Sequence, residues 1–316
     1  MSDAQPSPRR FSPAADNELP PERVVLAPHK RRDAVLEVIR AARRKLVLSL
    51  FRCDDFEVLD EVSEALERGV HVRILITPRA KGWGKRLKNL WTLLESMGAE
   101  LRRYSGVRKY HAKYIVSDDG PALVASLNFT RKCFHKTCDF LVITHDPEVV
   151  SGLQRLFDFD WEARQGPLPE GLGERLLVGP DQARERIRLL LGRARGRLRI
   201  IDHRVTDTDV VYLLNARRAE GVTIQVQGRG SLNGLRSHGK LILVDDGLAL
   251  TGSMSLSTAG MTGRREVSLL IRDPQCLRHL QDFFDTVAVA GLSEDLTPAP
   301  GEDEEEDDEE DAEEPD

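Results

Sequence analysis

The chain has 316 residues, of which 40% are hydrophobic and 31% charged, which is enough for about two domains with buried cores and excludes a fully disordered protein. Its apolar stretches, such as residues 45–51, have the length of a strand and fall far short of the roughly 18 residues that span a bilayer. The net charge of −6 hides a division, because residues 302–316 hold 13 acids and no base. The remaining 301 residues carry 46 bases against 39 acids, a net charge of +7, so a basic body carries a separate acidic tail.

Both ends of the chain have compositions typical of disorder. Residues 1–22 are rich in Pro, Ser and Ala without periodicity, and residues 294–316 are dominated by the acidic run, so we expect both segments to be disordered. The N-terminus lacks a basic region followed by an apolar one, and only four cysteines are present. These features predict a cytoplasmic protein, with peripheral contact to a membrane left open.

Between the ends, strand-length apolar runs alternate with amphipathic helical patterns, which predicts an α/β fold. The pattern occurs twice with a shift of 152 positions, so that Leu46 matches Leu198 and Gly69 matches Gly221. We therefore expect two duplicated α/β halves, each a mixed sheet flanked by helices, packed face to face around one shared active site. The predicted organisation is a first half at 23–165, a linker at 166–171 and a second half at 172–293.

Each half carries the same polar motif, H-x-K-x4-D-x6-(A/G)-S-x-(N/S). Its members are His111, Lys113, Asp118, Ser126 and Asn128 in the first half and His238, Lys240, Asp245, Ser253 and Ser255 in the second. An acid also follows each histidine by 28 positions, at Asp139 and Glu266. A histidine and a lysine two positions apart on a strand point to the same face, and a core needs no lysine. The duplicated set therefore indicates a functional site.

These residue types suit phosphoryl transfer without a metal or other cofactor. One neutral imidazole attacks phosphorus to give a phosphohistidine, while the other, protonated, gives its proton to the leaving alkoxide. The two lysines, with Ser126, Asn128 and Ser253, stabilise charge on the non-bridging oxygens. Asp139 and Glu266 each accept a bond from the ring nitrogen that is not used in the chemistry.

The paired motifs resemble the HKD motifs of the phospholipase D superfamily over residues 24–292. The resemblance implies that His111 is the nucleophile and His238 the general acid, with Lys113, Asp118, Lys240 and Asp245 completing the catalytic set. Three residues depart from the family pattern: Ala125 replaces Gly, Asp139 replaces Glu and Ser255 replaces Asn. Ser255 has a shorter side chain than Asn, which weakens the expected phosphate contact from the second half.

The first half contains 25 residues before its motif that the second half lacks. Within them Leu87, Leu90, Trp91 and Leu94 follow the spacing of an amphipathic helix ending at Gly98, so we expect a helix that packs on its own half. Residues 79–109 hold nine bases against two acids and end beside His111, which predicts a basic rim at the mouth of the site.

A basic rim fits two kinds of substrate. Anionic phospholipid headgroups at a membrane surface are one, with Trp83 placed at the interface; a nucleic-acid backbone is the other. Few aromatic residues are present for base stacking, which favours lipid. The leading prediction is a phospholipase D-type or cardiolipin synthase-like phosphodiesterase, with a metal-independent nuclease and a non-catalytic phosphate-binding module as alternatives.

Other candidate groups carry less weight. Cys133 and Cys138 have no partner pair at metal-ligand spacing, so no metal site is expected there. His203 follows the strand equivalent to the one ending at Phe51, which would let it line the interface between the halves. The acidic tail is expected to act as a solubiliser, or as an internal competitor of phosphate for the basic rim. The sequence does not fix the oligomeric state.

Overall fold

The computed structural model of the chain describes residues 21–228 and 230–288. The acidic tail at 294–316, the last residues of the expected second half and nearly all of the N-terminal segment lie outside these ranges. The predicted disordered segment at 1–22 extends too far, because Glu22 begins strand β1 (Glu22–Val25) and its carboxylate pairs with Arg175. Four residues on a sheet edge are too few to show as a pattern in the sequence.

Each half contains a mixed sheet. The first has the strand order β1, β9 (Leu141–Thr144), β7 (Ala122–Ala125), β6 (Tyr114–Ser117), β2 (Lys45–Leu50), β3 (His71–Ile76) and β4 (Glu100–Arg103). The second has the order β10 (Leu176–Val178), β18 (Val267–Ile271), β16 (Leu248–Gly252), β15 (Lys240–Val244), β11 (Arg197–Ile201) and β12 (Thr223–Gln227). Leu46 pairs with Val72 and Leu198 with Ile224, so the shift of 152 positions is kept in the strand register.

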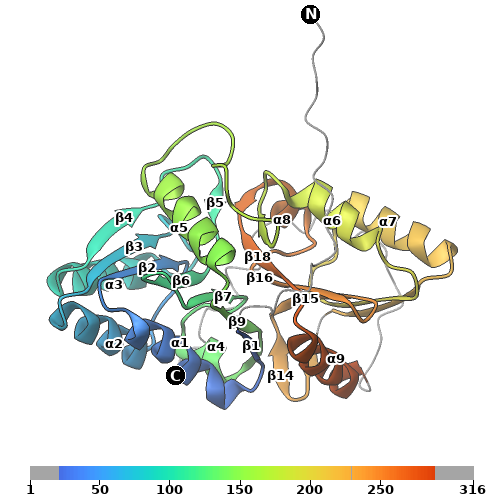
Figure 1. Ribbon diagram of the computed structural model, residues 1–316, viewed down its shortest axis with the longest axis horizontal. Helices are drawn as coiled ribbons and strands as arrows, with labels where there is room; N and C mark the ends of the chain where they lie inside the picture. Colours follow the sequence, from blue (N-terminus) through green and yellow to red (C-terminus); the bar gives the residue numbers. More distant parts are fainter. Residues whose placement is uncertain (1–20, 229, 289–316) are drawn as a thin grey trace, which may run out of the picture.

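Helices flank both sheets. The first half contains α1 (Pro28–Ala41), α2 (Phe56–Glu67), α3 (Gly84–Ser96), α4 (Arg131–His135) and α5 (Pro147–Trp161). The second contains α6 (Ala183–Leu191), α7 (Thr208–Ala219), α8 (Thr258–Thr262) and α9 (Pro274–Ala288). In Figure 1 the two halves lie side by side, with α5 on one face of the first sheet and α1 and α2 on the other. The predicted α/β class with two duplicated halves is confirmed.

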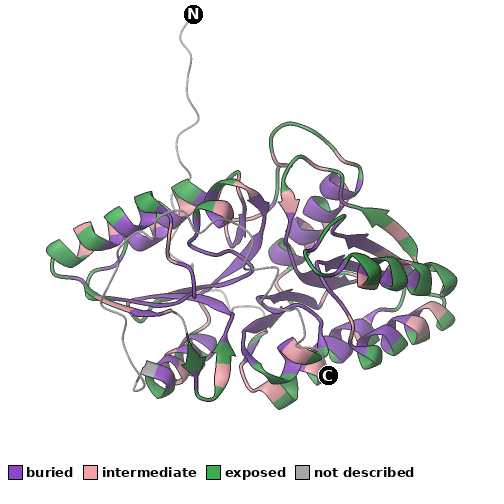
Figure 2. Ribbon diagram, turned by 180° about the vertical axis from the view of Figure 1, so that it is seen from behind, coloured by how far each residue is buried: buried purple, intermediate pink, exposed green. Residues whose placement is uncertain are grey.

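One apolar core continues from one half into the other. Buried side chains of both sheets pack there with α5 and α9, including Val124, Phe157, Leu241 and Phe284. One further core lies beneath the outer helices of the first half, and another beneath those of the second. Most strand residues of the two large sheets are buried, with the edge strand β4 as an exposed exception, and the helices expose one face each (Figure 2). Within the two ranges that the structure describes, no helix combines the length and apolarity needed to cross a bilayer.

Equivalent helices begin in the same way in the two halves. The Asp55 carboxylate accepts a bond from a backbone N–H in the first turn of α2, and Asp207 does the same for α7. Arg32 pairs with Asp55 at 2.7 Å and Arg184 with Asp207 at 2.9 Å. An acid at a helix N-terminus is favoured by the helix dipole, so both copies retain this local device.

Two small sheets join the halves, because each of them contains strands from both halves. In one, β14 (Leu235–Ser237) lies between β13 (Ser231–Leu232) of its own half and β8 (Thr137–Cys138) of the first. In the other, β5 (Lys109–Tyr110) of the first half pairs with β17 (Arg264–Arg265) of the second. Both inter-half pairings are parallel.

Candidate active site

The duplicated histidines and lysines lie at the junction of the halves. His111 and Lys113 lie between β5 and β6. His238 directly follows β14, and Lys240 is the first residue of β15. All four side chains are buried, although His111 and His238 keep 5% and 7% of their surface exposed. The strands that directly follow each motif, β6 and β15, are interior strands of their sheets, so the site is anchored on rigid elements.

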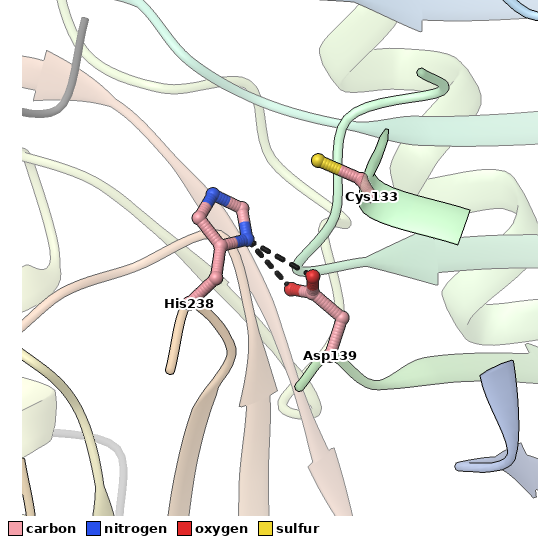
Figure 3. A group of neighbouring side chains, drawn as sticks. All are labelled: Cys133, Asp139 and His238. Carbon is pink, nitrogen blue, oxygen red and sulfur yellow. Dashed lines mark hydrogen bonds and ion pairs between the residues drawn. The ribbon is translucent and has the colours of Figure 1, made fainter. Parts of the chain in front are cut away.

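Each histidine is hydrogen-bonded to a carboxylate of the other half. The Nδ1 atom of His111 lies 2.9 and 3.0 Å from the two carboxylate oxygens of Glu266. The Nδ1 atom of His238 lies 2.8 and 3.0 Å from those of Asp139, as Figure 3 shows. The predicted hydrogen bonds, which these acids accept from ring nitrogens, are present, and each bond joins the two halves. Because Nδ1 is engaged in both rings, chemistry falls to Nε2.

The pairing of strands between the halves explains why each histidine contacts the acid of the other half. Ser237 pairs with Cys138 at the end of β14 and β8, and the next residues along the two strands are His238 and Asp139. In the other small sheet Arg265 pairs with Tyr110, and the next residues are Glu266 and His111. A parallel register therefore delivers each histidine beside the acid of the opposite half.

The two lysines bring positive charge to this junction. The Nζ atom of Lys113 donates to the carbonyl oxygen of His111, and that of Lys240 to the carbonyl oxygen of His238, both at 2.7 Å. The charges of both lysines also act on Glu266. Cations from the two halves thus converge on one site, where an anion would be stabilised.

The motif serines support the acids. Ser126 donates to a carboxylate oxygen of Asp139 at 2.6 Å and accepts from the backbone N–H of Phe140 at 2.9 Å. Ser253 is bonded to the backbone of Val267 and also to Glu266. Both were expected to contact phosphate, whereas the structure places each beside the acid that orients a histidine.

The last motif position differs between the copies for a reason visible in the structure. Asn128 is buried in the first half, while Ser255 donates to the carboxylate of Asp202 at 3.2 Å. Asp202 also accepts from the backbone N–H groups of Arg204 and Leu256. Sequence reasoning missed Asp202. The signal was available, because the shift of 152 positions sets it against an apolar residue of the first half.

A second difference lies beside the histidines. The Phe51 ring packs edge-on against His111 with centroids 4.7 Å apart, and the equivalent His203 stacks on His238 at 6.4 Å. His203 is 7% exposed and therefore belongs to the buried surroundings of the second histidine. The site is consequently more polar on the His238 side than on the His111 side.

Asp118 and Asp245 do not belong to this cluster. The Asp118 carboxylate accepts bonds of 2.7 to 2.9 Å from the backbone N–H groups of residues 43–45, and Asp245 bonds in the same way to residues 195–197. Asp118 lies five residues beyond Lys113, about 16 Å along an extended strand. The expectation that these acids are catalytic is corrected: both bind the turn that precedes the neighbouring strand, β2 or β11.

The two orienting acids differ electrostatically. Burial raises the pKa of Glu266 to about 7, despite the opposing charges of Lys113 and Arg264. Burial also acts to raise the pKa of Asp139, but His238, Arg31 and the Ser126 hydroxyl outweigh it and hold that pKa below its usual range. Asp139 is therefore ionised at neutral pH, whereas Glu266 is close to its titration point.

Possible metal ligands gather at one place in the described part of the chain, where atoms of Cys133, Asp139 and His238 lie within 4.8 Å of one another (Figure 3). Both oxygens of Asp139 already accept hydrogen bonds, from Ser126 and Thr137 as well as from His238. The donor set fits a histidine–carboxylate pair better than a metal centre.

The basic segment, residues 79–109, is anchored next to the active site. The Arg52 guanidinium packs over the Phe51 ring at 5.0 Å and over the Trp83 ring at 5.4 Å, and donates to the carbonyl oxygen of Lys81. Trp83 is 1% exposed, so its expected place at a membrane interface is wrong: it anchors the segment. The predicted amphipathic helix is α3, and its apolar face packs on the first half.

Comparisons with known proteins place these features in a family. A family model described as "Cardiolipin synthase, PLD-like domain" matches residues 35–161 and 181–288. The curated mitochondrial cardiolipin hydrolase of Chlamydomonas reinhardtii is 24% identical over 128 residues, which are 40% of this chain and 56% of that protein. The chain thus matches only about half of that relative's length.

Two solved structures share the fold. Polyphosphate kinase from Porphyromonas gingivalis has a TM-score of 0.70 and 17% identity, covering 84% of this chain and 50% of that one. Phosphatidylserine synthase from Haemophilus influenzae Rd KW20 has a TM-score of 0.65 and 14% identity, covering 89% of this chain and 90% of that one. At these identities the likeness concerns the fold alone.

Proposed function

Because the chain belongs to the phospholipase D superfamily, in its cardiolipin-synthase-type family of PLD-like domains, we propose that it is a phosphodiesterase that cleaves a glycerophospholipid through a phosphohistidine. The observation that carries the proposal is the pair of crossed contacts, His111 with Glu266 and His238 with Asp139. Two oriented imidazoles beside two buried lysines supply a nucleophile, an acid and a binding place for a phosphate.

In the first step the Nε2 lone pair of His111 forms a bond to phosphorus. The bond from phosphorus to the leaving oxygen breaks, and His238 gives its proton to that oxygen. An Nδ1–H bond from His111 to the Glu266 carboxylate leaves the ring lone pair on Nε2, the atom that attacks. Asp139, whose pKa is held below its usual range, is the ionised partner of the ring that gives the proton.

In the second step water or an alcohol attacks the phosphohistidine. His238, now neutral, accepts the proton of the attacking hydroxyl, and the electrons of the phosphorus–nitrogen bond return to His111. Lys113 and Lys240 offset the charge on the non-bridging oxygens in both steps. The buried amide of Asn128 is a further donor from the first half, without a counterpart of the same length in the second. No step requires a metal ion.

Two features favour a lipid substrate. The curated relative is named for hydrolysis of cardiolipin, and one structure with the same fold is a phosphatidylserine synthase. The exposed bases of residues 79–109, anchored beside the site through Arg52 and Trp83, suit an anionic surface. The same bases also suit a nucleic-acid backbone, so a nuclease is the second candidate.

The test uses the full chain with vesicles of mixed anionic and zwitterionic phospholipids in the presence of a chelator. Release of headgroup or phosphatidic acid is measured for the wild type, for His111→Ala and for His279→Ala, whose histidine is exposed on α9. We expect product from the wild type and from His279→Ala and none from His111→Ala. Cleavage of DNA or RNA without any lipid product would replace the proposal by the nuclease.

A further inference from the structure

The basic segment carries the whole positive excess of the body of the protein. Of the 46 bases and 39 acids in residues 1–301, nine bases and two acids lie in residues 79–109, so 37 bases and 37 acids balance elsewhere. One of the two acids, Glu100, already pairs with His71 at 3.0 Å. A concentrated charge of this kind attracts a partner of the opposite sign.

Several bases of this segment also differ from other surface bases in having no acid beside them. Elsewhere, exposed arginines pair with acids, as Arg40 does with Glu61 and Arg197 with Asp246. In the ranges that the structure describes, no carboxylate pairs with five exposed bases, which we name the basic edge: Arg79, Lys85, Lys88, Arg102 and Arg103.

The basic edge forms one surface along the outermost strand of the first sheet. Arg102 and Arg103 end β4, the last strand in the order, and Lys85 and Lys88 share a face of α3 because they are three positions apart. Arg79, Lys88 and Arg103 line one cavity of about 450 Å³. Arg102 and Arg103 line a second of about 500 Å³, so Arg103 makes the surface continuous.

This surface is connected to the active site. Strands β2, β3 and β4 are parallel, so their carboxyl ends share one edge of the sheet. The strand β2 leads to Phe51, whose ring packs against His111. Arg52 packs on Phe51 and on Trp83, the residue before α3. An anion on the basic edge therefore lies on the side from which a charged substrate would approach.

The chain contains its own polyanion of matching character. Residues 302–316, outside the described ranges, hold 13 acids and no base. Helix α9 ends at Ala288, 14 positions before Glu302. A segment of that length can span up to about 46 Å, whereas a folded body of this size has a radius of gyration of about 18 Å. The tail is thus long enough to reach the basic edge from α9.

We propose that residues 302–316 dock on the basic edge and compete there with anionic substrates. Tethering supplies the tail at an effective concentration in the millimolar range, so weak surface contacts suffice. Salt screens contacts between exposed charges, and docking should therefore weaken as the ionic strength rises. The docking is independent of the proposed function, whereas the competition rests on it.

Docking can be followed by fluorescence. All three tryptophans of the chain, Trp83, Trp91 and Trp161, pack against arginines in this region. The four native cysteines are buried, so a dansyl group can be attached to the tail through Ala312→Cys. Energy transfer from the tryptophans to the dansyl group is then measured at low and high salt.

The edge variant, Arg79→Gln/Lys85→Gln/Lys88→Gln, is compared with a control that removes three exposed bases elsewhere, Lys30→Gln/Arg195→Gln/Arg218→Gln. Both variants lose the same charge. We expect energy transfer to fall about twofold or more at high salt, and at low salt in the edge variant, but not in the control. Equal transfer in the edge variant and the control at low salt would overturn the docking.

The competition is tested by truncation after Gly301, with vesicles of phosphatidylglycerol and phosphatidylcholine as substrate. We expect KM to fall about threefold or more at low salt and to change little at high salt. A peptide of residues 302–316 added to the truncated chain should raise KM again. An unchanged KM at low salt would overturn the competition.

Two further outcomes separate the alternatives. If the edge variant loses vesicle or oligonucleotide binding equally in the full and the truncated chain, the basic edge serves that external partner and the tail does not occupy it, which overturns the inference. If the wild type cleaves no lipid, the proposed function fails, while energy transfer still decides whether the tail docks.

Discussion

The carboxylates that orient His111 and His238 come from opposite halves and carry different charge. Asp139 is ionised at neutral pH, because its contacts with His238 and Arg31 outweigh the cost of burial. Glu266 is close to its titration point, because burial raises its pKa to about 7. The two histidine–carboxylate pairs therefore differ electrostatically although their geometry is nearly the same.

Replacement of the two acids should therefore have different consequences. In Asp139→Asn the protonated form of His238 loses its ionised partner, so cleavage of an alkoxide leaving group should slow about 100-fold or more, and cleavage of a nitrophenol leaving group far less. In Glu266→Gln the attack itself is impaired, so both substrates should slow alike. Rates on the two substrates check this prediction, and the reverse pattern would exchange the roles of the histidines.

Asp118 acts on the backbone rather than on substrate. In Asp118→Ala the three N–H groups of residues 43–45 lose their acceptor, and alanine enters a position with φ of 44°. We expect a loss of about 1–3 kcal/mol in the free energy of unfolding, with kcat of the folded protein nearly unchanged. Denaturant titration and kcat at low temperature measure the two effects. A large fall in kcat at unchanged stability would restore a catalytic role.

Among the elements, the short strands that pair between the halves, β8 with β14 and β5 with β17, position the halves against each other. Gly239, between His238 and Lys240, lies so close to the first half that an added Cβ atom would be 2.7 Å from the carbonyl oxygen of Cys138 and from the Phe140 ring. The equivalent residue of the first motif is Ala112, which is buried. The tight approach is therefore specific to the second copy.

Gly239→Ala should push β8 and β14 apart and lengthen the bond between His238 and Asp139. We expect a loss of about 1–3 kcal/mol in stability together with lower activity. The matched control is Ala112→Gly, which removes a methyl group and should leave the junction in place. Urea midpoints and activity are measured for both, and full activity of Gly239→Ala would show that the junction tolerates displacement.

The duplication, both sheets and helix α3 could be predicted from sequence, because apolar periodicity and matching glycines mark them directly. The crossing of the pairs could not. Asp139 and Glu266 follow their histidines by the same 28 positions, so a contact within each half fits the sequence as well as a contact between halves. The two-residue strands that decide the matter, β5 and β8, are too short to leave a pattern. Asp118 and Asp245 share the spacing of the motif, so the sequence did not show that their carboxylates bind backbone turns.

At the scale of the whole molecule, buried acids make stability depend on pH. Burial raises the pKa of Glu266 to about 7 from an ordinary value of 4.5, so between these values the native state keeps a proton that the unfolded state has released. Asp160, whose pKa burial also raises to about 7, acts in the same direction. Stability should therefore fall as the pH rises from about 4.5 to about 7.

Urea denaturation at pH 5, 6 and 7 checks this trend. In Glu266→Gln the decline should be shallower than in the wild type, since one of the protons no longer contributes. Glu162→Gln, which changes an exposed acid, should follow the wild type. Identical slopes for Glu266→Gln and the wild type would mean that Glu266 does not titrate in this range.

The proposed function requires that one site, assembled from both halves, forms a phosphohistidine at His111. The most direct measurement is mass-spectrometric mapping of phosphorylated histidine after rapid acid-free quenching of His238→Ala with a phosphodiester whose leaving group is nitrophenol. Such a substrate needs no acid for departure, and loss of His238 slows hydrolysis of the intermediate. We expect a label on His111. A label on no histidine, or a label on His238 when His111→Ala is treated in the same way, would contradict it.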